Sequence, residues 1–127
     1  MASGDAFTAV QRHEIDKAIR DAETVCRLEF SVFVGRSDGE SRPFAERLHA
    51  ALVAPQRSVL VLVDPAARLV EVVTGTEASR VLDDAEVRLA VLTMESAFAT
   101  GDLVGGIVQG VQQLAEHARQ PRVRHGA

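Results

Sequence analysis

The spacing of hydrophobic positions along the chain predicts helices and strands in alternation. Apolar residues three and four positions apart indicate an amphipathic helix over about residues 10–26. Alternation of apolar and polar residues indicates a strand over 29–34. Residues 58–63 read SVLVLV and are apolar at nearly every position, a pattern typical of a central strand covered on both faces. A third strand is expected over 69–74.

Three further helices complete the expected set. Pro43 suits the first turn of a helix that runs to about Val53. Another helix is expected to begin near Asp83 and to end at Gly101, after which Asp102 caps the last one. The last two helices each present an apolar stripe, formed by Val87, Val91, Met94 and Phe98 and by Val104, Ile107, Val111, Leu114 and Ala118.

The connection lengths predict how the strands pair. A helix joins the first strand to the second, so these two should be parallel with a right-handed crossover. A short turn at Asp64-Pro65 joins the second strand to the third, so that pair should be antiparallel. The predicted fold class is α/β: a small mixed β-sheet with helices on both faces, an α/β/α sandwich. The starts of the first two strands and the end of the third should gather at one edge.

Length and composition favour one ordinary globular domain. The chain has 127 residues, of which 46% are hydrophobic and 25% charged. We assign residues 1–118 to a single domain and residues 119–127, which are rich in arginine, to a flexible basic tail. Cys26 is the single cysteine, which excludes an intrachain disulfide and a cysteine zinc site.

The charge balance argues against two classes of partner. A net charge of −4 disfavours both nucleic acid and an anionic membrane surface, and the absence of Trp and Tyr removes the usual stacking residues. The longest apolar run, residues 59–63, is far too short to span a bilayer. The N-terminus lacks the basic and apolar regions of a signal peptide, so a cytoplasmic location is expected.

Four acidic residues form the first candidate site. Glu29 opens the first strand and Glu77 follows the third. Asp83 and Asp84 open the next helix, so the expected topology gathers the four at one edge of the sheet. Their oxygens suit calcium or magnesium, and close carboxylates also suit acid–base chemistry. The alternative is structural, because an aspartate caps a helix N-terminus and a glutamate commonly begins an exposed strand end.

Other features have simpler interpretations. Asp64-Pro65 stands at the carboxyl end of the central strand, where ligands often bind in open α/β sheets, although a tight turn explains it more simply. No Gly-x-Ser-x-Gly pattern occurs, which disfavours a serine hydrolase. The histidines show no paired ligand spacing and are expected at the surface; they are His13, His49, His117 and His125.

The order of these motifs resembles the TPM domain family, which is named for thylakoid, phosphatase and modulator members. The resemblance runs from Arg12 to Ala118 and is closest to a short actinobacterial branch of unknown function. It rests on the strand around Glu29-Phe30, on SVLVLVDPAARLVEVVTG, on LDD at 82–84 and on FATGDLVGGI at 98–107. Members of the wider family are described as acid phosphatases, photosystem repair factors and membrane-anchored modulators.

The resemblance also implies a divalent-metal site, because several members resemble metal binders with acidic residues where the second strand begins. The chain departs from that pattern, since Arg57-Ser58 replaces the family's Asp-Gly or Asn-Gly and Thr76 replaces a glycine. The resemblance would also imply a signal peptide and a membrane anchor, and we expect neither from this sequence. Arg57 would repel a cation and can bridge carboxylates, so we expect it to replace the metal.

Two functions follow as expectations. The first is a non-enzymatic TPM-like module that binds a protein partner or a second copy of itself. The altered motif before the second strand and the lack of a nucleophile pattern favour this interpretation. The alternative is a divalent-metal-dependent, acid-phosphatase-like hydrolase with an acidic site at the sheet edge.

Overall fold

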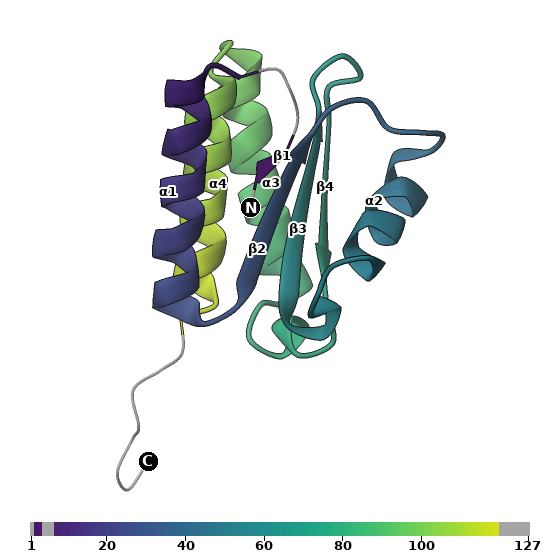
Figure 1. Ribbon diagram of the computed structural model, residues 1–127, viewed down its shortest axis with the longest axis vertical. Helices are drawn as coiled ribbons and strands as arrows, with labels where there is room; N and C mark the ends of the chain where they lie inside the picture. Colours follow the sequence, from purple (N-terminus) through teal and green to yellow (C-terminus); the bar gives the residue numbers. More distant parts are fainter. Residues whose placement is uncertain (1, 4–6, 120–127) are drawn as a thin grey trace, which may run out of the picture.

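The computed structural model describes residues 2–3 and 7–119 (Figure 1). The strands are β1 (Ala2–Ser3), β2 (Glu29–Val34), β3 (Ser58–Asp64) and β4 (Leu69–Thr74). The α-helices are α1 (Ala9–Cys26), α2 (Ser41–Ala50), α3 (Asp84–Ala99) and α4 (Leu103–His117), and the short 3-10 helices are η1 (Pro55–Arg57) and η2 (Ala78–Arg80). Residues 120–127, most of the expected basic tail, lie outside the described residues.

The strands form one mixed sheet in the order β1-β2-β3-β4. β2 and β3 are parallel, with Phe30 opposite Val59, and β3 and β4 are antiparallel, with Val63 opposite Val70. α1, α3 and α4 cover one face of the sheet and α2 covers the other (Figure 1). The predicted α/β class, a small mixed sheet with helices on both faces, is therefore confirmed.

β1 is the strand that the hydrophobic pattern does not indicate. Its two residues pair in parallel with β2, with Ala2 opposite Val32. Two residues are too few to show a period, so such a strand is defined by the edge it pairs with and not by its own sequence.

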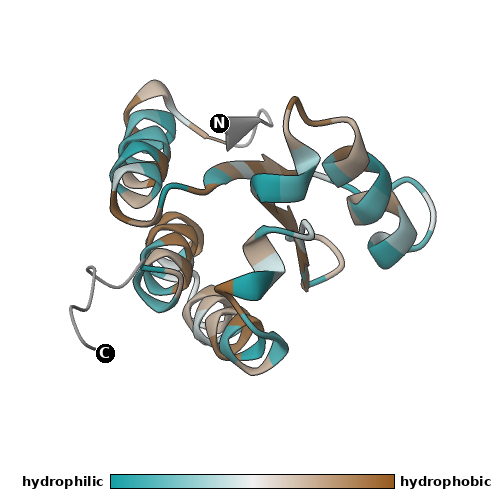
Figure 2. Ribbon diagram, turned by 90° about the horizontal axis from the view of Figure 1, so that it is seen from below, coloured by the Kyte–Doolittle hydropathy of each residue, from teal (hydrophilic) through white to brown (hydrophobic). Residues whose placement is uncertain are grey.

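The side chains of β3 divide the core between the two faces of the sheet, as the alternation of a strand requires. Val59, Val61 and Val63 join the larger cluster beneath α1, α3 and α4, while Leu60 and Leu62 join the smaller cluster beneath α2. Every residue of β3 is buried, which confirms its interior position. Figure 2 shows the same layering, with hydrophobic colour on the strands and on helix surfaces turned toward them.

His49 differs from its expected surface position, since it is only 9% exposed in the last turn of α2. Its Nε2 atom lies 3.0 Å from the carbonyl oxygen of Ser58, at the start of β3. A buried polar ring requires such a partner, and the packing of α2 on the sheet supplies it. His125 lies outside the described residues.

β4 forms one edge of the sheet, and side chains from α2 reach it. Arg42 donates from Nη1 to the carbonyl oxygen of Val72 at 2.8 Å, and the same nitrogen lies 3.5 Å from the Glu71 carboxylate. Ser41 donates its hydroxyl hydrogen to Glu71 over 2.7 Å. These contacts tie α2 to the edge strand that it covers.

Two glycines of α4 allow a close approach to α3. A Cβ atom at Gly110 would overlap the Met94 side chain, and one at Gly106 would come within 2.6 Å of the Phe98 ring. This packing fixes Phe98 near the junction of the two helices, where it bears on the candidate site.

Helix length and polarity bear on the expected relation to membranes. Within the described ranges, none of the helices is both long and apolar enough to cross a bilayer. α1 has 18 residues, and its exposed side carries charged residues such as Glu14, Lys17 and Asp21.

Candidate functional site

Glu29 and Arg57 meet at the amino end of β3. Glu29 begins β2 opposite Ser58, and Arg57 is the last residue of η1, directly before β3. The Arg57 Nε atom lies 3.9 Å from a carboxylate oxygen of Glu29. Arg57 also donates from Nη2 to the carbonyl oxygen of Arg27 at 2.9 Å, so its guanidinium joins the end of α1 to the start of β2.

The other three predicted acidic residues serve different local positions. Asp83 is the N-cap of α3 and accepts a hydrogen bond from the Glu86 backbone N–H at 2.8 Å, and Glu86 accepts one from the Asp83 N–H at 3.0 Å. Asp84 is exposed in the first turn of α3, where the helix dipole favours a negative charge. Glu77 is exposed before η2, and its backbone N–H donates to Gln56.

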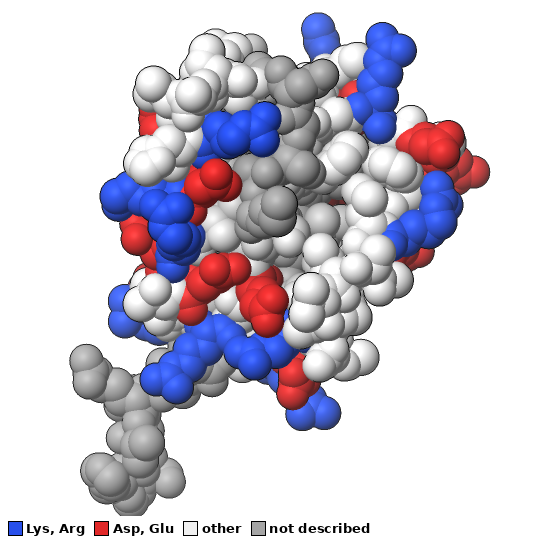
Figure 3. Space-filling view, in the orientation of Figure 1, with Lys and Arg blue, Asp and Glu red and all other residues white. Residues whose placement is uncertain are grey.

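The amino end of the sheet is therefore a mixed charged surface. Figure 3 shows acidic and basic side chains side by side at the lower end of the face in view. Among the residues that the structure describes, no group of three or more His, Cys, Asp or Glu side chains is arranged to hold a metal ion. The structure brings Glu29 and Arg57 together and gives Asp83 the capping position.

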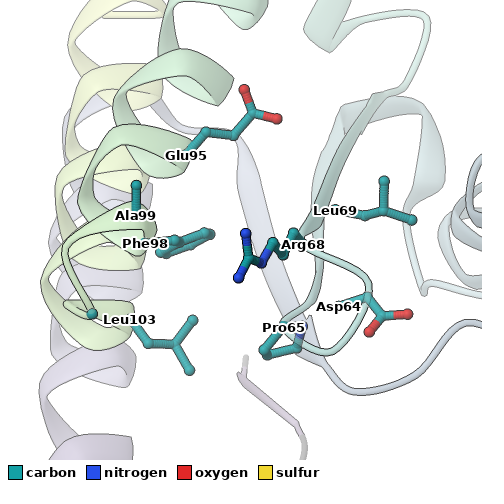
Figure 4. Close-up of a pocket in the computed structure, with 9 residues that line it drawn as sticks. Asp64, Pro65, Arg68, Leu69, Glu95, Phe98, Ala99 and Leu103 are labelled. Atoms are coloured by element: carbon teal, nitrogen blue, oxygen red, sulfur yellow. The ribbon is translucent and has the colours of Figure 1, made fainter.

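A pocket lies at the opposite, carboxyl end of β3, between the β3–β4 turn and the junction of α3 with α4 (Figure 4). Its volume is about 500 Å³, which falls in the range of small-ligand sites. The lining residues are Asp64, Pro65, Arg68, Leu69, Glu95, Phe98, Ala99, Gly101 and Leu103. Most of these present apolar surface.

The β3–β4 turn positions Arg68. Asp64 is buried and accepts backbone hydrogen bonds from Ala67 at 3.2 Å and from Ser37 at 3.1 Å, which fixes the start of the turn. The Arg68 N–H donates to the Pro65 carbonyl, and Arg68 has a φ of 57°, in the left-handed region that residues with a Cβ rarely adopt. Figure 4 shows its guanidinium directed into the pocket, while the Asp64 carboxylate points away.

The junction of α3 with α4 forms the apolar wall. Gly101 has a φ of 85° and ends α3, and Asp102 caps α4 by accepting a hydrogen bond from the Gly105 N–H at 2.9 Å. These two features turn the chain sharply after Phe98 and before Leu103. Figure 4 shows both side chains facing the Arg68 guanidinium across the pocket.

The Arg68 charge in this pocket has no counterion among the residues that the structure describes. Within the described residues, neither an ion pair nor a hydrogen bond involves the Arg68 guanidinium, and Glu95 likewise has no ion pair. Glu95 lies at the rim with its carboxylate directed away from Arg68 (Figure 4). Arg68 is exposed to solvent, so its attraction for an anion is strengthened only as far as the apolar walls beside it reduce screening by water.

Cys26 contributes no reactive group. The side chain is fully buried at the end of α1, and burial raises the pKa of the thiol above its ordinary value. A raised pKa lowers the fraction of thiolate, which is the nucleophilic form.

Comparison with known proteins assigns the family. The model of a family described as Domain of unknown function (DUF5130) matches residues 2–115. The chain belongs to this family. The expected membership of the TPM domain family is wrong, since the matching model is that of DUF5130. The motifs behind the TPM resemblance form a buried strand with its turn, and a helix end followed by the cap of the next helix. Such features are common to many α/β folds and do not identify one family.

Two relatives of this DUF5130 chain come from Mycobacterium tuberculosis, namely Uncharacterized protein MT2543 of strain CDC 1551 and Uncharacterized protein Rv2468c of strain H37Rv. Each is 25% identical over 101 residues, which are 80% of this chain. The matched region spans only 60% of the length of these curated relatives.

Solved structures share the fold. The BA42 protein of the psychrophilic bacterium Bizionia argentinensis has a TM-score of 0.81 at 21% identity, over 90% of this chain and 82% of that one. The N-terminal domain of cg2496 from Corynebacterium glutamicum has a TM-score of 0.76 at 15% identity, over 99% and 86%. At these identities the likeness establishes the fold alone.

Proposed function

We propose that this DUF5130 chain is a non-enzymatic binding domain. Its pocket at the carboxyl end of β3 takes a short segment of a protein partner in which a carboxylate stands next to an apolar side chain. The observation that carries the proposal is the Arg68 guanidinium, which points into an apolar-walled pocket and has no counterion among the described residues.

The chemistry of the walls specifies the two parts of the ligand. A guanidinium presents paired N–H donors that match a carboxylate in two parallel hydrogen bonds. Phe98 and Leu103 offer apolar surface beside it. A segment that supplies both groups neutralises the cation and removes apolar surface from water in one event.

The ionisable groups at the pocket favour binding over catalysis. Both oxygens of Asp64 accept backbone hydrogen bonds, and the described residues that line the pocket include neither His nor Cys. A metal-dependent hydrolase remains the weaker interpretation, because its acidic residues at the amino end serve a helix cap and an ion pair. Ligands of open α/β sheets commonly bind at the carboxyl ends of strands, where this pocket lies.

Two synthetic tripeptides test the proposal: acetyl-Phe-Asp-Leu-amide and its isostere acetyl-Phe-Asn-Leu-amide. Each is titrated into isotopically labelled protein and followed by amide chemical shifts in NMR spectra. We expect saturable shifts around residues 65–69 and 98–103 with the Asp peptide, and about tenfold weaker binding with the Asn peptide, because one charge-assisted pair is lost.

Arg68→Gln removes the cation and should weaken binding of the Asp peptide to the level of the Asn peptide. Arg20→Gln is the matched control, since Arg20 is exposed on α1, away from the pocket. Equal affinity for the two peptides, or full binding by Arg68→Gln, would refute the role given to Arg68. Shifts confined to the amino end of β3 would place the binding site elsewhere.

A further inference from the structure

The outer face of α3 carries an apolar stripe. Leu89 and Leu92 are 50% and 52% exposed, although they lie in the middle of a regular helix. Ala85 and Ser96, which are small and exposed, extend the stripe by one turn in each direction. Residues at these three- and four-position spacings share one side of a helix.

Two opposite charges flank this stripe. Arg88 and Glu95 are exposed and lie seven positions apart, so both fall on the same side of the stripe, two turns from each other. They are too far apart along the helix to pair with each other. Within the described part of the chain, no ion pair involves either of them.

We propose that this stripe binds the same stripe of a second copy of the chain, with the two α3 helices antiparallel. The two-fold axis passes between Leu89 and Leu92, so that each leucine of one copy meets the other leucine of its partner. Ala85 then faces Ser96 of the second copy, where small side chains allow close approach of the backbones. The surface is complementary to itself, as a two-fold interface requires.

The flanking charges select this arrangement. A two-fold axis across antiparallel helices brings equivalent flanks together, which places Arg88 of one copy beside Glu95 of the other, twice in the dimer. The axial offset between the two Cα positions is about 3 Å, from the rise of about 1.5 Å per residue, and an arginine side chain spans it readily. A two-fold parallel arrangement would instead set this flank of one copy against the opposite flank of the other, so Arg88 and Glu95 would not meet.

The dimer proposal rests on the outer face of α3 and not on Arg68, and Glu95 is the one residue it shares with the described lining of the pocket. Sedimentation of the full chain from about 10 μM to 1 mM measures it. One helix pair forms a small interface, so we expect a reversible monomer–dimer equilibrium within this range. Leu92→Gln should shift it to monomer. Val53→Gln is the matched control, because Val53 is 100% exposed and outside α3, and it should leave the equilibrium unchanged.

Charge reversal tests the orientation. Arg88→Glu and Glu95→Arg should each weaken dimerisation, on the order of tenfold, because each creates two repulsive contacts across the axis. The double variant restores opposite charges and should recover dimerisation. A chain that stays monomeric up to about 1 mM overturns the proposal. A dimer insensitive to Leu92→Gln, or a double variant as weak as the singles, overturns it as well.

Discussion

Charged residues lie at both the amino end and the carboxyl end of β3, and they differ in what they contact. At the amino end, Arg57 lies 3.9 Å from Glu29 and donates to a backbone carbonyl, while Asp83 caps α3. At the carboxyl end, Arg68 points into a pocket and has no counterion within the described residues. The first set of charges has partners within the protein, whereas Arg68 has none among the described residues.

The difference teaches that the number of charged residues in a region is a poor guide to a site. Three acidic residues near the amino end have positions that a helix or a strand pair explains. A single arginine beside Phe98 and Leu103 has no structural role that its side-chain contacts reveal. The following predictions test this contrast, beginning with the largest expected effect.

Gly75→Ala should destabilise the fold by about 3 kcal/mol, because the added methyl group would clash with backbone atoms that cannot move aside as a side chain can. A Cβ atom at this position would overlap the backbone of Pro55 and Gln56, at the amino end of β3. Gly35 is the matched control at the carboxyl end, where a Cβ would meet only the Phe33 ring at 3.1 Å. Urea unfolding should show a loss of under about 1 kcal/mol for Gly35→Ala. Equal losses would show that the amino end is no more rigid than the pocket end.

Asp83→Ala should cost about 1 kcal/mol, because it removes the side-chain half of a capping box. Asp84→Ala should cost only about 0.3 kcal/mol, since Asp84 interacts with the helix dipole in an exposed first turn. Chemical denaturation of both variants measures the contrast. A neutral Asp83→Ala would contradict the structural role assigned to this carboxylate.

Arg68→Gly should stabilise the fold by about 0.5 kcal/mol and abolish binding of the Asp peptide. Glycine relieves the left-handed backbone at φ 57°, and part of this gain is offset by the greater freedom of glycine in the unfolded chain. Arg27 has a φ of 64° at the amino end, so Arg27→Gly should give a similar gain without affecting binding. Loss of peptide binding in both variants would remove the distinction between the two arginines.

Calcium at about 5 mM should change the melting temperature by less than about 1 °C, because the described part of the chain holds no set of carboxylates arranged to bind the ion. The basis is the contact of Arg57 with Glu29 and the capping role of Asp83. A larger rise that disappears in Asp83→Asn would establish a cation site at the amino end and reverse the contrast.

Most of the fold could be predicted because local pattern and connection length agree. The apolar run of β3, the short turn after it and the caps Asp83 and Asp102 each have a local cause. The helix expected from Pro43 to Val53 instead runs from Ser41 to Ala50. Residues 51–54 form turns and bends that lead into η1 and then β3. β1 and the burial of His49 depend on distant partners and have no local signal.

The pocket could be predicted only in part. Asp64-Pro65 marks the strand end where ligands of open α/β sheets commonly bind, but the sequence alone favours a simple turn there. Phe98 belongs to the inner apolar stripe of α3, so the sequence indicates only that it packs against the core and not that it also lines the pocket. The left-handed backbone of Arg68 falls on a residue that gives no sign of it, unlike a glycine.

The contact between Arg42 and Val72 has a consequence for how the molecule behaves at high concentration. An edge strand offers unpaired backbone groups to any other extended chain, and such edges are common starting points for aggregation. The Arg42 guanidinium donates a hydrogen bond to one of these carbonyl oxygens and places a positive charge along the edge of β4. Half of the Arg42 side chain is exposed. A strand arriving there would have to displace a hydrogen-bonded cation before it could pair. α2 thus protects the sheet from unwanted growth, in addition to covering the smaller half of its core.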